Sequence, residues 1–217
     1  GDVVGTTSSD PQASTPVSGA MTNGYRSFSV SLGTVGTQTL TVNDQTNGSI
    51  QSMTSAGIPV IPNASARSAI EDLPTPITAG SQVAVTVHAA DQNGNTIPTF
   101  SGQGILTANT GPGSIYPEAI TFANGSWTGN VLFKGAGGSV TITCADYASP
   151  PHTGTSNAIQ VLPGPLAKLQ VILPGQTPLG GTDAGFSGTP DDQNAGSSFT
   201  LTIRAVDAYW NLVPGVN

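Results

Sequence analysis

The sequence predicts an all-β protein made of β-sandwich modules, and two observations carry that prediction. The first is a duplicated stretch: residues 79–98 and 195–214 align without a gap, with eight of twenty positions identical. The second is alternation inside this stretch, where every other residue is apolar (Val83, Val85 and Val87, then Phe199, Leu201 and Ile203). A period of two indicates a strand with one buried face. Repetition of a strand, a polar turn and a second strand indicates tandem modules.

The turn that follows each of these strands is also duplicated. An aspartate precedes it and an asparagine and a proline follow it, as Asp91, Asn95 and Pro98, and again as Asp207, Asn211 and Pro214.

Residues 63–164 contain the complete pattern of one module, with some seven short strands, and we expect an immunoglobulin-like sandwich there. Residues 1–62 repeat its second half. Val3-Val4 aligns with Ile105-Leu106, and the Asn23-Gly24 hairpin turn aligns with Asn124-Gly125. Residues 165–217 repeat its first half. The predicted division is therefore 1–62 as the C-terminal half of a module, 63–164 as a complete module, and 165–217 as the N-terminal half of a further module.

The offsets between the copies are close to 102 and 116, and their sum is close to the 217 residues of the chain. A half sandwich leaves its core face and strand edges in water, which favours aggregation. We therefore expect neighbouring copies, head to tail, to complete both halves. They would do so within one continuous polypeptide or between subunits. The alternative is a closed monomer in which the two halves pack on each other.

The amino-acid composition argues against several classes of function. Charged residues make up only 8% of the chain and the net charge is −7, so the sequence lacks the clustered Lys and Arg of a nucleic-acid surface. No apolar run reaches the roughly 20 residues of a transmembrane helix, so we expect no membrane insertion of this segment. Cys144 is the one cysteine, which excludes an intrachain disulfide, and it falls on the buried side of an alternating strand.

Candidate sites are few, and no catalytic constellation is visible, so we expect no enzyme. The Asp91-Gln92-Asn93-Gly94-Asn95 loop has the oxygen ligands that calcium prefers, with Asp91, Asn93, Asn95 and Asp146 as candidates. The simpler interpretation is a strand-to-strand turn without cofactor or metal, because the second copy of the loop loses the central oxygens. His88 and His152 have no second ligand at metal spacing. Tyr209 and Trp210 form an aromatic pair suited to an interface, or to stacking on a sugar.

The chain resembles bacterial immunoglobulin-like tandem-repeat surface proteins, of the invasin/intimin-like and filamin-like kinds. The resemblance is carried by the strands ending at Asp91 and Asp207, by their turns, and by the strands ending at Asp44 and Asp146. It implies a structural module of a secreted or cell-surface fibre or stalk. An adhesin or carbohydrate-binding module is the first alternative, and an ancillary domain of a secreted hydrolase is the second.

Overall fold

The structure is a computed structural model that describes residues 2–64 and 66–216, and it is all-β with several sheets. Two compact units are present. The first unit comprises residues 1–64 and 91–95, and the second comprises residues 65–90 and 96–217. These units group the residues differently from the three-part division of the chain expected from the repeats, which stays a prediction.

The first unit contains two antiparallel sheets, ordered β2-β1-β4-β5 and β3-β6. Its strands are β1 (Val3–Ser8), β2 (Val17–Ala20), β3 (Gly36–Gln38), β4 (Leu40–Asp44), β5 (Met53–Thr54) and β6 (Ile58–Val60). Asn23 and Gly24 form a tight turn with φ of 51° and 83°. Only residues that tolerate positive φ suit such a turn. The predicted turn is therefore confirmed, but it closes on the single bridge between Thr22 and Tyr25, and no strand is assigned to residues 26–32 that follow it.

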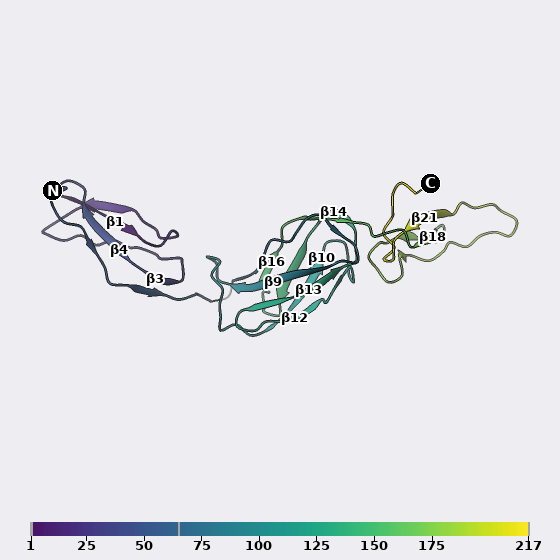
Figure 1. The fold of residues 1–217 in the computed structure, drawn as a ribbon, viewed down its shortest axis with the longest axis horizontal. Helices are drawn as coiled ribbons and strands as arrows, with labels where there is room; N and C mark the ends of the chain where they lie inside the picture. The colour runs from purple at the N-terminus through teal and green to yellow at the C-terminus, as the bar shows by residue number, and fades with distance from the viewer. Residues whose placement is uncertain (1, 65, 217) are drawn as a thin grey trace. The chain divides into compact units, whose positions relative to one another are not determined.

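The second unit contains a β-sandwich between residues 67 and 162, called here the central sandwich (Figure 1). One sheet has the order β12-β10-β15-β16, the second β11-β13-β9-β7, and a third β14-β17-β8. The strands are β7 (Arg67–Ile70), β8 (Ile77–Thr78), β9 (Gln82–Ala90), β10 (Gln103–Ala108), β11 (Ile115–Tyr116), β12 (Ala119–Thr121), β13 (Ser126–Phe133), β14 (Gly137–Val140), β15 (Ile142–Asp146), β16 (Thr153–Thr155) and β17 (Ile159–Leu162).

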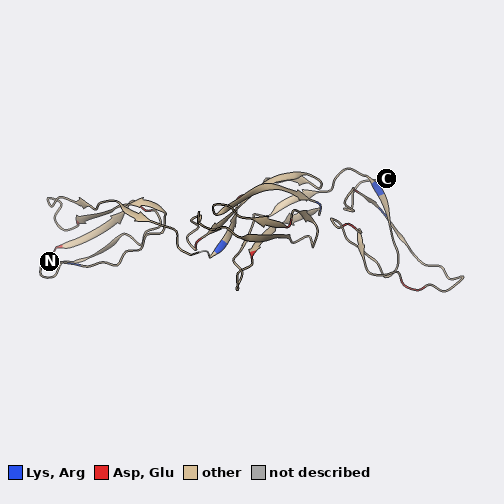
Figure 2. Cartoon of the chain, turned by 90° about the horizontal axis from the view of Figure 1, so that it is seen from below, with Lys and Arg blue, Asp and Glu red and all other residues tan. Residues whose placement is uncertain are grey.

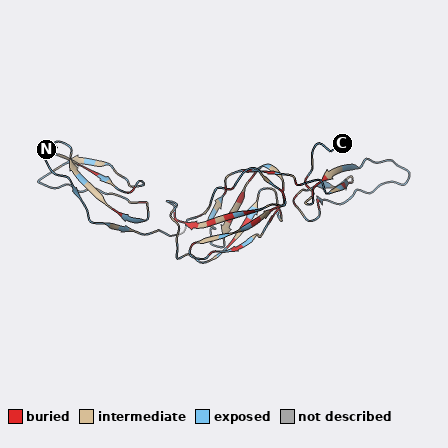
Figure 3. Ribbon diagram, in the orientation of Figure 1, coloured by how far each residue is buried: buried red, intermediate tan, exposed pale blue. Residues whose placement is uncertain are grey.

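One hydrophobic core fills the central sandwich, because the sheets direct alternate apolar side chains toward each other. The fully buried members include Val85 and Val87 from β9, Leu106 from β10 and Ile142 from β15. Cys144 is also buried in this core, as its position in the alternating strand predicted. Figure 3 shows the buried positions gathered in these strands.

The second unit also contains a small antiparallel sheet of two strands, β18 (Lys168–Ile172) and β21 (Thr202–Val206), called here the C-terminal sheet. A separate two-stranded ribbon pairs β19 (Thr177–Pro178) with β20 (Phe186–Ser187). No helix in the described residues is both long and apolar enough to cross a membrane.

The pairing registers outside the central sandwich match those inside it at nearly constant offsets. In β18–β21, Lys168 lies opposite Val206, as Arg67 lies opposite Ala90 in β7–β9. In β3–β6, Gly36 lies opposite Val60, as Gly137 lies opposite Val161 in β14–β17. The C-terminal sheet thus has the register of β7–β9. The β3–β6 pair shares the Gly137–Val161 position of β14–β17 but runs on without the irregularity that follows Gly137 there.

One sequence alignment was wrong by two residues. Val4 lies opposite Asp44 in β1–β4, and Gly104 lies opposite Asp146 in β10–β15. Val4 therefore corresponds to Gly104, and Thr6 takes the place of the core residue Leu106. The apolar pair Val3-Val4 suggested the other alignment, but strand register follows the backbone ladder and the adjoining turns.

Candidate functional site

The most unusual feature of the second unit is the apolar face of its C-terminal sheet. Leu169 and Val171 on β18, and Ile203 on β21, are 69%, 51% and 62% exposed. Side chains two residues apart on a strand, and those directly opposite on its neighbour, lie on the same face, so Leu169, Val171 and Ile203 share one face of the sheet. Phe199 and Leu201, which precede β21 and continue its alternation in the sequence, are 49% and 45% exposed. These five exposed apolar residues are called here the open face.

The same positions are closed in the central sandwich. Val83, Val85 and Val87 of β9 correspond in register to Phe199, Leu201 and Ile203, and their exposed fractions are 7%, 0% and 0%. Burying a Val, Leu, Ile or Phe side chain stabilises a protein by about 1.5–3 kcal/mol. The five side chains of the open face are 45–69% exposed, so roughly half of that stabilisation would still be gained on covering them.

The edge of β21 is open as well as its face. In the central sandwich, β9 pairs with β7 on one edge and with β13 on the other, from Gln82–Leu132 to His88–Ser126. In the described part of the chain, β21 pairs with β18, and no strand lies along residues 198–204 on its second edge. Such an edge presents backbone N–H and C=O groups that a further strand can bind.

The first unit contains a stretch of chain that has no partner strand in the described residues and that resembles the strand missing beside β21. Residues 25–32 correspond to β13, because the turns at Asn23-Gly24 and Asn124-Gly125 are equivalent and each precedes this stretch. In β13, Val131 and Phe133 are fully buried. In the first unit the equivalent Val30 and Leu32 are only partly buried, and no strand pairs with residues 26–32 among the residues described.

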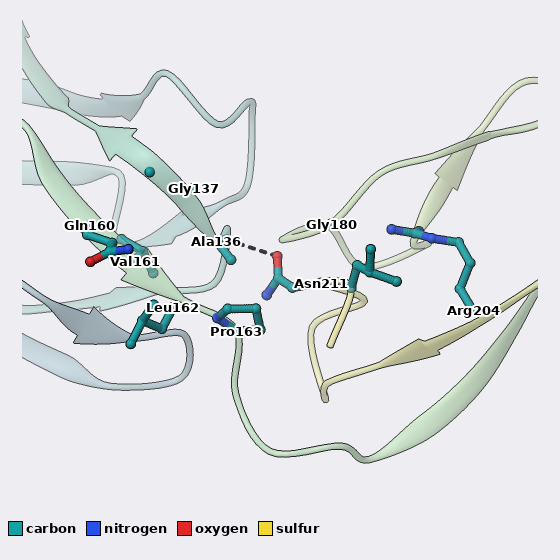
Figure 4. A pocket seen from close by; sticks show the side chains of 11 residues that line it. Ala136, Gly137, Gln160, Val161, Leu162, Pro163, Gly180, Arg204 and Asn211 are labelled. Atoms are coloured by element: carbon teal, nitrogen blue, oxygen red, sulfur yellow. Dashed lines mark hydrogen bonds between the residues drawn. The ribbon is translucent and has the colours of Figure 1, made fainter. Parts of the chain in front are cut away.

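A second recurring feature is an arrangement of Asp and Asn that we call the Asp–Asn clasp. In the second unit, the Asp207 carboxylate accepts hydrogen bonds from the backbone N–H groups of Gly164, Tyr209 and Asn211 at 2.7–2.9 Å. The Asn211 side chain donates to the Lys134 carbonyl at 2.7 Å and accepts from the Ala136 N–H at 2.9 Å (Figure 4). The clasp therefore ties the turn after β21 to the backbone before β14.

The first unit contains the same clasp. Asp91 accepts hydrogen bonds from the backbone N–H groups of Asn63, Asn93 and Asn95 at 2.9–3.2 Å. The Asn95 side chain donates to the Gly33 carbonyl at 2.7 Å and accepts from the Val35 N–H at 3.2 Å. Burial raises the pKa of Asp91, but the hydrogen bonds from these asparagines outweigh burial and lower it.

The clasp explains why Asp91 and Asn95 recur in the sequence, and it bears on the calcium candidates. Both Asp91 carboxylate oxygens accept hydrogen bonds from N–H groups, as does the Asn95 side-chain oxygen. Asn93 joins through its backbone N–H. Asp146 instead pairs with His152 Nδ1 at 2.7 Å and accepts from the Ala148 N–H, which lowers its pKa despite burial. No cluster of three or more His, Cys, Asp or Glu suited to a metal occurs within residues 2–64 and 66–216.

The aromatic pair is largely covered by its own chain. The Lys168 ammonium lies 3.3 Å from the centre of the Trp210 ring, and Trp210 Nε1 donates to the Asp183 carbonyl. Gly185 lies against the same ring, where an added methyl would meet Trp210 Cγ at 2.5 Å. Tyr209 similarly contacts Gly80. Both residues therefore contact other parts of the second unit beside the clasp, and both stay partly exposed.

An open pocket of about 400 Å³ lies beside the clasp, between the β14–β17 end of the central sandwich and the turn at Asn211 (Figure 4). Its lining is mostly glycine, alanine and apolar side chains, and Arg204 is its one charged residue. Charged side chains are sparse along the whole chain (Figure 2). The pocket thus offers few groups with which to orient a ligand.

No protein-family model and no curated protein matches the chain. A solved structure that is similar to it is that of domains 4–9 of surface layer protein SbsC. The two are 20% identical, with a TM-score of 0.32, and the match covers 98% of this chain and 29% of that one. The chain thus spans less than a third of the length of that solved structure.

Proposed function

We propose that the chain is a structural module of a long extracellular or cell-surface fibre or stalk, and that neighbouring copies complete its two unfinished halves head to tail. The modules are immunoglobulin-like sandwiches, and the role is mechanical, without catalysis. The observation that carries the proposal is the open face, where residues equivalent to the buried Val85 and Val87 lie exposed as Leu201 and Ile203.

The central sandwich supports a second copy of the protein as the partner. There the face of β9 is covered by strands from residues 103–162. In this chain the segment that resembles those strands is the first unit, through the turn at Asn23-Gly24 and the Gly36–Val60 pair of β3–β6. A second copy of the protein therefore supplies a surface of the shape that the open face lacks. Repeated head to tail, such contacts build a fibre.

Composition supports the proposed location. A surface rich in Thr, Ser, Gly and Asn with 8% charged residues suits a secreted or surface-exposed β protein, and the net charge of −7 opposes nucleic-acid binding. The covered Trp210 ring gives no support to the alternative of a carbohydrate-binding module, because sugar stacking needs an accessible aromatic face.

The test is self-association of residues 1–217, measured by analytical ultracentrifugation over a range of concentrations and by negative-stain electron microscopy. We expect the wild-type protein to form larger species as its concentration rises. Leu201→Lys places a charge on the open face and should abolish this association.

Thr200→Lys is the matched control, because it places the same charge on the neighbouring residue, which falls on the polar side of the alternation. It corresponds to the exposed Ala84 of the central sandwich and should associate like the wild type. A wild-type protein that stays monomeric at all concentrations, or equal behaviour of the two lysine variants, would contradict the proposal.

A further inference from the structure

We infer that residues 25–31 of a second copy add as an antiparallel strand along residues 198–204, which are the start of β21 and the stretch before it, in the register that β13 has against β9. The inference rests on the proposed function and specifies its contact: which segment enters, which edge receives it, and which residues lie opposite each other. It is an addition of one strand to a sheet, stabilised by backbone hydrogen bonds along the edge and by side chains on one face.

The donor segment is already prepared for this role. Its odd-numbered residues are Tyr25, Ser27, Ser29 and Ser31, and its even-numbered residues are Arg26, Phe28 and Val30, so hydroxyl side chains lie on one side and the two apolar side chains lie on the other, with Arg26. The turn at Asn23-Gly24 is formed and has the same φ signs as the turn before β13. The segment therefore lacks only a neighbouring strand, which in the central sandwich is β9 beside β13.

The acceptor edge is equally prepared. β18 holds β21 in the register that β7 imposes on β9, so the backbone of β21 is already extended. Apolar residues Phe199, Leu201 and Ile203 alternate with Ser198, Thr200 and Thr202, of which only Thr202 and Ile203 lie within β21 and residues 198–201 precede it. A strand added here would extend the two-stranded sheet to three strands and cover part of the open face.

The register is set by the central sandwich. There Thr128 lies opposite Thr86, Asn130 opposite Ala84 and Val131 opposite Val83. Transferred through the equivalent turns and strands, these pairs become Ser27–Thr202, Ser29–Thr200 and Val30–Phe199. A shift of one residue would turn the apolar side of the donor toward solvent, so the alternation of both strands opposes it.

In this register a large side chain and a small one have changed places between the donor segment and β13. In β13, the large Trp127 is followed two residues later by Gly129, and an added methyl on Gly129 would meet the Trp127 ring. In the donor segment the equivalent residues are Arg26 and Phe28, whose guanidinium and ring lie 5.7 Å apart. The large ring thus stands two residues later in the donor segment than in β13. Phe28 would lie opposite Leu201, where the central sandwich has Gly129 opposite Val85.

The experiment is disulfide trapping in residues 1–217 carrying Cys144→Ala, with circular dichroism checking that the fold is kept. Ser29→Cys and Thr200→Cys introduce two thiols on the polar side of the proposed pair. Directly opposite residues of an antiparallel pair lie about 4.5–5.5 Å apart, which suits a disulfide, whereas diagonal neighbours lie about 7–8 Å apart. Ser29→Cys with Thr202→Cys is the diagonal control.

We expect mild oxidation to link the in-register variant into dimers and larger species on non-reducing gels, and the diagonal control to lose this product. Association without linkage, or equal linkage of both variants, would overturn the register while leaving the proposed function standing. A disulfide within one chain would show that the two halves of a single copy pair with each other, which overturns the second copy as partner. Absence of both linkage and association would remove the proposed function itself.

Discussion

Asn211 donates a hydrogen bond from Nδ2 to the Asp207 carboxylate at 2.8 Å, and Asn95 makes the same bond to Asp91 at 3.0 Å. The side chain of each asparagine also forms hydrogen bonds with the backbone of a segment about 60–80 residues earlier in the chain. Because both partners are needed for one arrangement, the Asp and the Asn recur together. The intervening residues contribute no side chain to the clasp, which is why they differ between the two copies.

The clasp predicts the effect of removing Asn211. Asn211→Ala leaves the Lys134 carbonyl and the Ala136 N–H without their side-chain partners, and an unsatisfied buried polar group costs about 1–3 kcal/mol. We expect a loss of that size in the free energy of unfolding of the second unit, measured by urea denaturation. Asn194→Ala, an exposed position on the loop before β21, is the control and should change stability little.

Asp10 predicts a stability change in acid. Burial raises the pKa of Asp10, but hydrogen bonds from Thr34, Gln12 and Gly33 outweigh burial and lower it from 3.8 to about 2. The folded first unit therefore favours the carboxylate form more than the unfolded chain does. Its contribution is fully present above the unfolded pKa of 3.8 and is lost as pH falls toward 2.

The measurement is urea denaturation of the first unit at pH values from neutral to 2, followed by an NMR titration of the Asp10 carboxyl carbon. Asp10→Asn removes the titrating group, so we expect its stability to vary less over the acid range than that of the wild type. An equally steep decline in the variant would show that other carboxylates dominate.

The two equivalent hairpin turns predict unequal costs for the same substitution. Gly24 and Gly125 have φ of 83° and 75°, so alanine at either position adopts a left-handed conformation that costs roughly 1–2 kcal/mol. At Gly125 the new methyl would also press on the backbone of Ile97, whereas at Gly24 it would meet no atom within 4 Å. We expect Gly125→Ala to be the more destabilising, measured by thermal unfolding at concentrations low enough to keep copies apart. Similar losses would mean that the Ile97 loop yields to the methyl.

Equivalent apolar positions should respond differently to truncation. Val85→Ala removes two methyl groups from a fully buried site and should cost about 2 kcal/mol in the unfolding free energy of the central sandwich. Leu201→Ala removes a larger side chain from a position that is 45% exposed, so we expect little loss in a dilute monomer. Its effect should appear as weaker self-association in sedimentation experiments. A large loss of monomer stability in Leu201→Ala would instead indicate that the open face is covered within one chain.

Much of the candidate site could be predicted from the sequence, because alternation reports which face of a strand is apolar. Phe199, Leu201 and Ile203 were assigned to one face, and the equivalence with Val83, Val85 and Val87 led to the expectation of an unfinished sandwich. The sequence indicates only part of the clasp. Asp91 and Asn95 recur as a pair, but the backbone groups of Gly33 and Val35 that Asn95 binds lie some 60 residues away and have no sequence pattern that identifies them.

Local patterns in the residues are enough to assign the class of fold, the tight turn at Asn23-Gly24, the burial of Cys144 and the match between the repeated strands. Periodicity, turn residues and duplicated segments carry these assignments. Three features required the three-dimensional structure: the register of Val4, the hydrogen bonds of Asn211 to Lys134 and Ala136, and the position of Lys168 over Trp210. Those features depend on which distant backbone groups meet, and hydrogen-bond partners far apart in the chain leave no periodic trace in its residues.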